Sequence, residues 1–296
     1  MSPPDPVLLV GHPRRQGTEH AARRVVDRLR SAGVDVHVLD EDPPDLDGVA
    51  RIGADDVAAL SPQMVLVLGG DGTLLRAAEI ARPTAAPLLG VNFGRVGFLA
   101  EAEGADLDEV LDAVLEGRWT VEDRVTVEAV VRDGDGRETD RGWALNEAVL
   151  EKGDRERVLD LLVEVDGRPV SRFGCDGVLC ATPTGSTAYA FSAGGPVVWP
   201  QVRALLVVPV SAHALFARPL VVDPESVVAL EVDGGGIDAF LSCDGRRAVE
   251  VPAGSRVEVR QGDTDVRVVR LVGSCFSDRL VARFRLPVQG WRGPAA

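Results

Sequence analysis

The side chains that could do chemistry lie in a few short polar strings, the strongest being Gly69-Gly70-Asp71-Gly72-Thr73. Its glycines let the backbone approach a ligand closely. The amides and dipole of a following helix then make an anion site that needs no lysine. Because a carboxylate repels a bound phosphate, Asp71 must bind a metal, accept a hydroxyl proton or simply cap the helix. Arg76, one turn further on, either reaches the same anion or is solvated surface.

Two further strings offer polar groups for a nucleotide. Residues 89–99 read as a strand that leaves into a glycine-spaced loop, and their structural and binding interpretations stay equally open. Asn146 and Glu147 end an apolar strand. An Asn side chain suits an adenine edge or a ribose, and a Glu suits ribose hydroxyls or Mg²⁺. The alternative is a buried structural pair in a hairpin.

The longest string, residues 174–196, is rich in glycine and small hydroxyl residues, which favour a flat, donor-rich pocket for a purine and its sugar. Tyr189 is the only tyrosine in the chain, and its ring is expected to cover a base. A serine nucleophile is the competing interpretation. GxSxG is absent and no histidine lies near Ser186 or Ser192, so hydrolase chemistry is disfavoured.

Composition excludes several classes of protein. The 296 residues carry 32 Lys plus Arg against 46 Asp plus Glu, a net charge of −14, which disfavours generic binding to nucleic acid or to membrane surfaces. Lys152 is the only lysine, and no GxxxxGK[ST] phosphate loop occurs. The cysteines form no CxxC and the histidines no HExxH, which disfavours zinc. Without a signal sequence or a long apolar run, we expect a cytoplasmic protein.

The elements that must position these groups change character near Trp119. Before it, apolar runs at 7–10, 34–39, 64–68 and 88–91 alternate with helical patterns from Thr18, near 55–60, and at 74–81 and 107–115. This alternation predicts a Rossmann-like parallel sheet, with ligands at the carboxyl ends of its strands. After it, strand patterns dominate, with one short helix in 184–195. They lie at 125–131, 143–150, 158–165, 205–208, 227–232, 239–243, 257–259 and 266–272.

The predicted organisation is therefore an α/β domain over 1–118, a mostly β, sandwich-like domain over 119–280 and a tail over 281–296 that docks back on the body. The four cysteines are expected to be buried, reduced thiols.

The strings together resemble the NAD kinase family. GGDGT alone is shared with lipid kinases and, more distantly, phosphofructokinases, whereas the string DG…TPTGSTAYAFSAGGP resembles NAD kinases in particular. GVNFGRVGFLAE, ALNE, HALFARPL and CDG follow in the family's order, so the resemblance covers almost the whole chain and is greatest to the actinobacterial branch. One departure is Gly174, where many relatives carry an arginine, and Arg172 is the nearby candidate to replace it.

The resemblance implies transfer of the terminal phosphoryl group of ATP, or of polyphosphate, to the 2′-hydroxyl of the adenosine ribose of NAD, with a divalent metal such as Mg²⁺. Asp71 would be the general base, and Gly72 would share the contact that Asp71 makes with the nucleotide. Asn146 and Glu147 would hold adenosine, with Arg76 and Arg157 on phosphates. The remaining NAD residues implied by the family's motif are Asp176, Thr187, Ala188, Tyr189, Ala190, Phe191, Ser192 and Asp244.

Other function classes remain open at this point. A lipid kinase with GGDGT would need an apolar cleft for an acyl chain, and an assay with NAD or a lipid alcohol separates the two. A nucleotide sensor without catalysis is disfavoured because Asp71, Asn146 and Glu147 are all present. The family resemblance also implies a homodimer or homotetramer.

Overall fold

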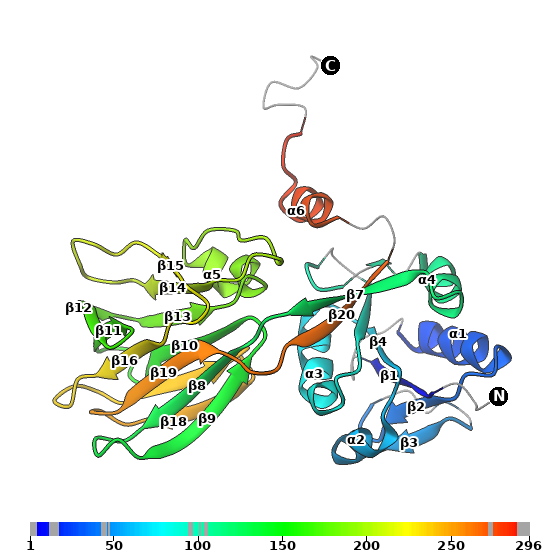
Figure 1. Cartoon of the computed structure of the whole chain (residues 1–296), viewed down its shortest axis with the longest axis horizontal. Helices are drawn as coiled ribbons and strands as arrows, with labels where there is room; N and C mark the ends of the chain where they lie inside the picture. The colour runs from blue at the N-terminus through cyan, green and yellow to red at the C-terminus, as the bar shows by residue number, and fades with distance from the viewer. Residues whose placement is uncertain are drawn as a thin grey trace. The chain divides into compact units, whose positions relative to one another are not determined.

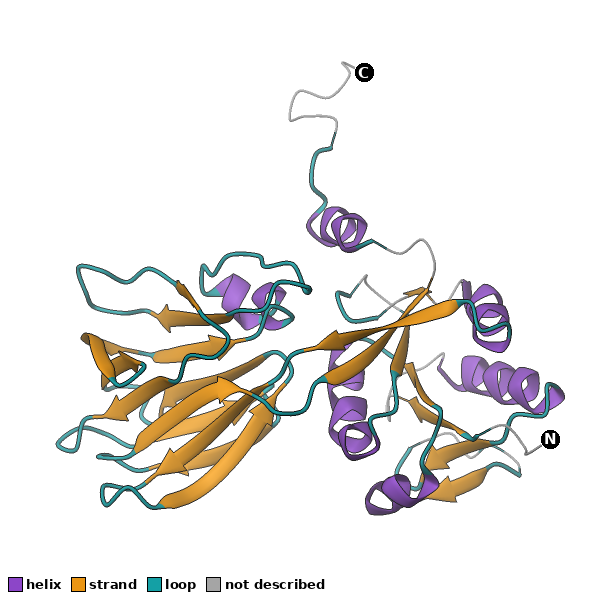
Figure 2. Cartoon of the chain, viewed as in Figure 1, coloured by secondary structure: helices purple, strands orange, loops and turns teal. Residues whose placement is uncertain are grey.

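The computed structural model describes residues 5–11, 18–42, 46, 48–93, 97–100, 102–103, 106–271 and 275–288, which form two compact units. The first comprises Met1–Asp123 with Val266–Ala296, and the second comprises Arg124–Asp265. Helices are concentrated in the first unit, and strands make up most of the second (Figure 2). The division differs from the expected boundaries at 118/119 and 280/281, because residues 119–123 and all residues from Val266 onward belong to the first unit.

The first unit is built on a sheet with the strand order β3-β2-β1-β4-β5-β20-β7, with β6 beside β5. The contiguous order from β3 to β5 is that of a Rossmann-like sheet, and all of those neighbours are parallel. The strands are β1 (Val7–Gly11), β2 (Val36–Leu39), β3 (Ala50–Ile52), β4 (Met64–Leu68), β5 (Leu88–Asn92), β6 (Ala102–Glu103), β7 (Trp119–Arg124) and β20 (Val266–Leu271).

Helices cover both faces of this sheet. On α1 (Thr18–Ser31), the predicted stripe from Ala22 to Leu29 is buried, and it shares a core with α4 (Leu107–Leu115) and alternate residues of β1 and β4. The opposite face contacts α3 (Asp71–Ala81), which packs on β4 and β5 (Figure 1). Short helical turns η1 (Ala54–Asp56), α2 (Val57–Leu60) and η2 (Arg82–Thr84) complete this layer. The predicted α/β architecture is confirmed.

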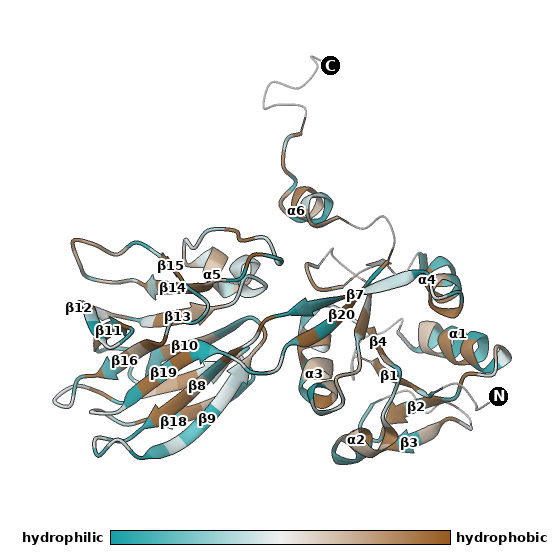
Figure 3. Cartoon of the chain, in the orientation of Figure 1, coloured by the Kyte–Doolittle hydropathy of each residue, from teal (hydrophilic) through white to brown (hydrophobic). Residues whose placement is uncertain are grey.

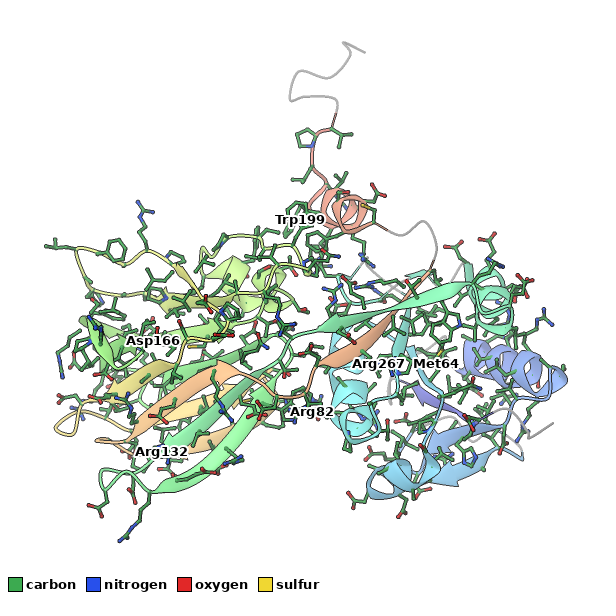
Figure 4. All side chains as sticks on the ribbon, in the orientation of Figure 1. Met64, Arg82, Arg132, Asp166, Trp199 and Arg267 are labelled. Atoms are coloured by element: carbon green, nitrogen blue, oxygen red, sulfur yellow. The ribbon has the colours of Figure 1, made fainter. Side chains whose placement is uncertain are left out.

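Strand β20 was expected in the β-rich half, but it returns to the first sheet. Val268 pairs in parallel with Leu88 of β5, and the guanidinium of Arg267 donates to the carbonyl of Ala85 at 3.1 Å (Figure 4). An apolar alternation identifies a strand but not its partner, which is why the sequence misplaced it. The following helix, α6 (Phe276–Phe284), places the rings of Phe276 and Phe284 within 5.9 Å of Phe98.

The second unit is a sandwich of two six-stranded sheets, as predicted, whose strands pair antiparallel. Their inner faces form one apolar core, burial alternates along β8 and β19, and Figure 3 shows the hydrophobic residues of the sandwich strands. One sheet has the order β15-β14-β13-β10-β17-β18, with β10 (Glu147–Lys152), β13 (Gly177–Ala181), β14 (Leu205–Val210), β15 (Leu220–Val222), β17 (Ala239–Cys243) and β18 (Arg247–Val251). The other has the order β12-β11-β16-β19-β8-β9, with β8 (Val127–Arg132), β9 (Glu138–Ala144), β11 (Leu159–Val165), β12 (Arg168–Cys175), β16 (Val228–Val232) and β19 (Arg256–Gln261).

One predicted strand of the sandwich is wrong in a way that matters for the site. Residues 143–150 read as one strand, but the chain turns at Leu145 and Asn146 and passes from β9 in one sheet to β10 in the other. The expected helix in 184–195 is two short pieces, η4 (Gly185–Thr187) and α5 (Tyr189–Ser192). Among the described residues, no helix is long and apolar enough to cross a membrane.

Candidate active site

Asp71 is the first residue of α3, directly after the glycine turn that follows β4. The N-cap position belongs to Gly70, which makes no side-chain cap, so helix capping is not the role of the Asp71 carboxylate. Instead its two oxygens each accept a backbone N–H, from Phe98 and from Leu99, both at 3.2 Å. Each carboxylate oxygen has a second lone pair, so Asp71 can still accept a proton from a hydroxyl.

Glycine is required at three places around this carboxylate. A Cβ on Gly97 would lie 2.3 Å from Oδ1 of Asp71, and a Cβ on Gly69 would lie 2.4 Å from Oγ1 of Thr73. The same atom on Gly90 would lie 2.8 Å from a methyl of Leu74. These close approaches hold the start of α3 against β5 and its loop. Residues 94–96 of the predicted glycine-spaced loop lie outside the described residues.

Arg76 is engaged with carboxylates of the first unit. Its guanidinium pairs with Asp42 and with Glu41, both at 2.6 Å, and donates to the carbonyl of Gly11 at 3.3 Å. Five residues along a helix correspond to a rotation of about 140°, so Arg76 and Asp71 project from different sides of α3. Asp42 is 3% exposed, and burial is the main cause of its raised pKa. Arg76 thus ties α3 to the ends of β1 and β2.

In the second unit, the turn at Asn146 is held by the buried carboxylate of Asp244. Oδ2 accepts the N–H of Leu145 at 2.9 Å, and Oδ1 accepts the N–H of Asn146 at 2.7 Å and of Glu147 at 3.4 Å. Arg247 pairs with the same group at 3.0 Å and stacks over the ring of Trp143, 4.6 Å from its centroid. Asp244, predicted from the family to contact NAD, therefore directs its carboxylate to backbone amides.

Glu147 is buried beside this clamp. Burial, and then the charge of Asp244, raise the pKa of the Glu147 carboxyl to about 8. The backbone N–H of Tyr189 has the opposite effect and lowers this pKa. Oε2 of Glu147 has no hydrogen-bond partner among the residues that the structure describes. With a pKa of about 8 this carboxyl is largely protonated at neutral pH, and a protonated carboxyl can donate to a ligand as well as accept from one.

The string 182–192 is anchored to the same turn. The hydroxyl of Thr182 donates to the carbonyl of Leu145 at 2.6 Å, and the N–H of Thr182 donates to the carbonyl of Asn146 at 2.9 Å. Gly185 lies so close to Asn146 that a Cβ on residue 185 would be 2.0 Å from the backbone carbonyl oxygen of Asn146. The predicted NAD residues beyond this anchor differ in exposure. Ala190 is buried, Thr187 and Ala188 are half-buried, and Tyr189, Phe191 and Ser192 are exposed.

The Ser186 hydroxyl is used locally. It donates to the carbonyl of Pro183 at 2.6 Å, and it accepts the N–H of Val198 at 2.9 Å. These bonds make Ser186 a buried structural hydroxyl in the turn before α5. This arrangement agrees with the sequence analysis, which gave serine hydrolase chemistry little weight.

Of the remaining predicted residues, Asp176 lies between β12 and β13, where Lys152 pairs with it at 2.7 Å. That pairing, followed by the Ser211 hydroxyl, lowers the pKa of Asp176. Arg157 is exposed in the turn between β10 and β11. Cys175, Cys180 and Cys243 are buried thiols, as expected, whereas Cys275 is exposed.

The donor set fits a metal that arrives with a nucleotide. Within the described part of the chain, no group of three or more His, Cys, Asp or Glu side chains could hold a metal ion. Mg²⁺, however, is usually held by one or two carboxylates together with substrate phosphates and waters. Asp71 offers a single carboxylate with lone pairs to spare at a helix N-terminus, which suits such an ion.

The structure thus assembles Asn146, Glu147, Asp244 and the 182–192 string in one unit, and Asp71 with its glycines in the other. Sequence reasoning gave no role to Gly97, Asp42 or Lys152. The glycine spacing of the 89–99 string was a visible signal for Gly97. Asp42 and Lys152 act through partners distant in the chain, at Arg76 and Asp176, and no local pattern marks them.

Comparison with known proteins bears on both units. Residues 50–119 match the ATP-NAD kinase N-terminal domain, and residues 145–271 match the ATP-NAD kinase C-terminal domain. The chain is 54% identical to an NAD kinase of Thermobifida fusca, with 98% of this chain and 92% of that protein covered. It is 55% identical to NAD kinase 2 of Streptomyces avermitilis, with 97% and 96% covered.

Solved structures agree on the fold. A yeast NADH kinase complexed with NADH superposes with a TM-score of 0.84 at 22% identity, covering 97% of this chain and 89% of that one. An NAD kinase from Archaeoglobus fulgidus in complex with ATP gives a TM-score of 0.72 at 25% identity, covering 94% and 98%.

The first unit has a Rossmann-like sheet with an aspartate-bearing glycine turn, and the second has an antiparallel sandwich that clamps an Asn-Glu turn. The family models that match these two units place the chain among the kinases. Within that class, the chain belongs to the NAD kinase family, and its enzymatic activity is that of an NAD kinase. The resemblance inferred from the motifs is confirmed, including its actinobacterial character.

Proposed function

We propose that this enzyme transfers the terminal phosphoryl group of ATP to the 2′-hydroxyl of the adenosine ribose of NAD, with Asp71 as general base. The observation that carries the proposal is the fixed carboxylate of Asp71, aimed by the amides of Phe98 and Leu99 at the start of α3. A carboxylate is a weak base at neutral pH. Asp71 therefore takes the proton late, as phosphoryl transfer acidifies the attacking hydroxyl.

The glycine turn contributes by position rather than by charge. Gly69, Gly70, Gly72 and Thr73 bring backbone amides to the N-terminus of α3, where the helix dipole favours phosphate oxygens. With no phosphate-loop lysine, the charge of the donor has to be offset by these amides and by a divalent ion. Asp71 would contribute a carboxylate ligand to Mg²⁺ beside the nucleotide phosphates, and the ion would supply that neutralisation.

The second unit supplies recognition of NAD. Asn146 offers an amide for the adenine edge or the ribose, and the neutral carboxyl of Glu147 offers both a donor and an acceptor for ribose hydroxyls. The exposed ring of Tyr189 is available to stack on a base. Asp176 and the residues from Thr187 to Ser192 complete the NAD contacts. We place Asp244 behind the site, where it positions Asn146 and Glu147.

Arg76 is a weaker candidate for a phosphate contact than the sequence suggested, because its guanidinium already pairs with Asp42 and Glu41. Arg157 is exposed in the turn between β10 and β11, and its contact with a phosphate stays a prediction. The use of polyphosphate, a homodimeric or homotetrameric assembly and a cytoplasmic location also stay predictions.

The direct experiment is to measure NADP formation from NAD with purified enzyme and either ATP or polyphosphate, with and without EDTA. We expect turnover with ATP and Mg²⁺ and its loss on chelation. Full activity in EDTA would contradict the metal requirement. Failure to use ATP while polyphosphate is used would contradict the choice of donor.

A further inference from the structure

Lys152, the only lysine of the chain, lies at the end of β10 and faces Asp176. Its Nζ is 2.7 Å from Oδ1 of Asp176 and donates to the carbonyl of Arg155 at 3.1 Å. The backbone N–H of Lys152 also donates to the carbonyl of Asp176 at 3.0 Å. Lys152 and Asp176 are therefore joined through both backbone and side chain, which fixes the ammonium on the carboxylate.

Asp176 has further polar neighbours on the same side. The Ser211 hydroxyl donates to it, and the imidazole of His213 adds a favourable charge when protonated. The contact with Lys152 is nevertheless the largest cause of the lowered pKa of Asp176. The Asp176 side chain is 46% exposed, so it is held in place without being withdrawn from solvent.

The surroundings of Tyr189 are strongly acidic. Burial is the main cause of the raised pKa of its phenol, followed by the charge of Glu151 and its hydrogen bond, with smaller contributions from Asp176 and Glu147. NAD carries a pyrophosphate, so uncompensated carboxylates near its site oppose binding. Lys152 is in contact with one of these carboxylates, that of Asp176, and offsets its charge.

Two other positions had been candidates for that cation. Arg172 pairs with Asp233 at 3.2 Å, and its side chain is more than half exposed. Gly174 has no room for a side chain, because a Cβ there would lie 2.6 Å from Cγ1 of Val158. The structure therefore gives the contact with Asp176 to Lys152 and not to residue 172 or 174.

We propose that Lys152 is a positioning residue for NAD binding, which aims the carboxylate of Asp176 and cancels its charge so that Asp176 can accept hydrogen bonds from NAD. The inference rests on the proposed function, in which Asp176 contacts NAD. Lys152 acts through Asp176, so its removal should affect capture of NAD and leave phosphoryl transfer almost unchanged.

The test compares Lys152→Met, which keeps the length of the side chain, with Lys152→Arg, which keeps the charge, in the full chain. We expect Lys152→Met to raise the KM for NAD about fivefold, with kcat and the KM for ATP within about twofold of wild type. Lys152→Arg should restore most of the affinity. Arg172→Met, which breaks the exposed pair with Asp233, is the matched control and should leave all three constants unchanged.

Asp176→Asn separates this inference from the proposed function. If Asp176→Asn leaves the KM for NAD unchanged, the placement of Asp176 in the NAD site is wrong. If Asp176→Asn raises the KM but Lys152→Met does not, the role of Lys152 is overturned while the NAD site stands. In the double variant, the KM should equal that of Asp176→Asn alone, because Lys152 acts through Asp176. If the two substitutions instead raise the KM for NAD independently in the double variant, Lys152 does not act through Asp176.

A second measurement uses the native protein and does not depend on activity. Lys152 and the amino terminus are the only amines, so acetylation by an N-hydroxysuccinimide ester can be followed at a single side chain by mass spectrometry. Saturating NAD should slow acetylation of Lys152 several-fold, and ATP alone should not. A rate that NAD does not change would contradict the proposal.

Discussion

Gly97 lies against the carboxylate of Asp71 so closely that a Cβ at this position would be 2.3 Å from Oδ1. The two residues that follow Gly97 donate their backbone N–H groups to the same carboxylate at 3.2 Å. A glycine is thus what allows the loop after β5 to hold Asp71 from behind. The orientation of the proposed base is determined by this loop as well as by α3.

Replacing Gly97 with alanine should therefore impair catalysis more than folding. The Cβ would push the Asp71 carboxylate out of position, and a displacement of about 1 Å can cost roughly 100-fold in rate. We expect kcat to fall by about that factor with a nearly unchanged melting temperature, measured by differential scanning calorimetry. Gly134→Ala, where the nearest atom to a Cβ is 3.8 Å away, is the control. Equal kcat values for Gly97→Ala and wild type would refute this role.

The buried Glu147 predicts a pH dependence of stability. Its pKa of about 8 in the folded state exceeds the ordinary value of 4.5, so between these values the folded state holds a proton that the unfolded state releases. The free energy of unfolding should therefore fall as pH rises from about 5 to 8, by an amount on the order of a few kcal/mol. Glu147→Gln removes the titrating group, and its stability should change less over this range. Denaturant unfolding at pH 5.5 and 8 measures the difference, and parallel pH profiles would disprove it.

Asp244→Asn should loosen the turn at Asn146. If the NH₂ group replaces Oδ2, it faces the buried N–H of Leu145 and the half-buried guanidinium of Arg247, and both lose an acceptor. Such a loss costs about 1–3 kcal/mol. We expect lower stability in urea and a raised KM for NAD, because Asn146 and Glu147 are no longer held. A stable variant with a normal KM would show that the clamp has no function.

How far the sequence could take the fold is clear from particular residues. The burial of the α1 stripe followed from its helical periodicity, and the strand Met64–Leu68 followed from its unbroken apolar run. The break between β9 and β10 at Leu145 and Asn146 could not be predicted in this way. Apolar residues lie on both sides of Asn146 and Glu147, and only the partner sheets show that the chain has changed layers. Strand β20 was misplaced for the same reason.

The residues of the candidate site likewise fall into those that the sequence could identify and those that it could not. Asp71, Asn146 and Glu147 were identified because their types and their places after strands already indicate chemistry. The functions of Gly97, Asp244 and Lys152 depend on contacts with residues 26, 98 and 24 positions away. Only Gly97 had a local signal, the glycine spacing of the 89–99 string, and that signal did not reveal its contact with Asp71. Arg76 looked available for a phosphate because the sequence could not reveal its pairing with Asp42.

The most direct test of the account is the rate of NADP formation from NAD and ATP by Asp71→Asn. The amide keeps one oxygen for the N–H of Phe98 or Leu99 but cannot take the ribose proton, so we predict a kcat lower by about 100- to 10,000-fold. Circular dichroism and calorimetric titration should show an intact fold and retained NAD binding. Near-normal turnover by this variant would contradict the assignment of Asp71 as the general base.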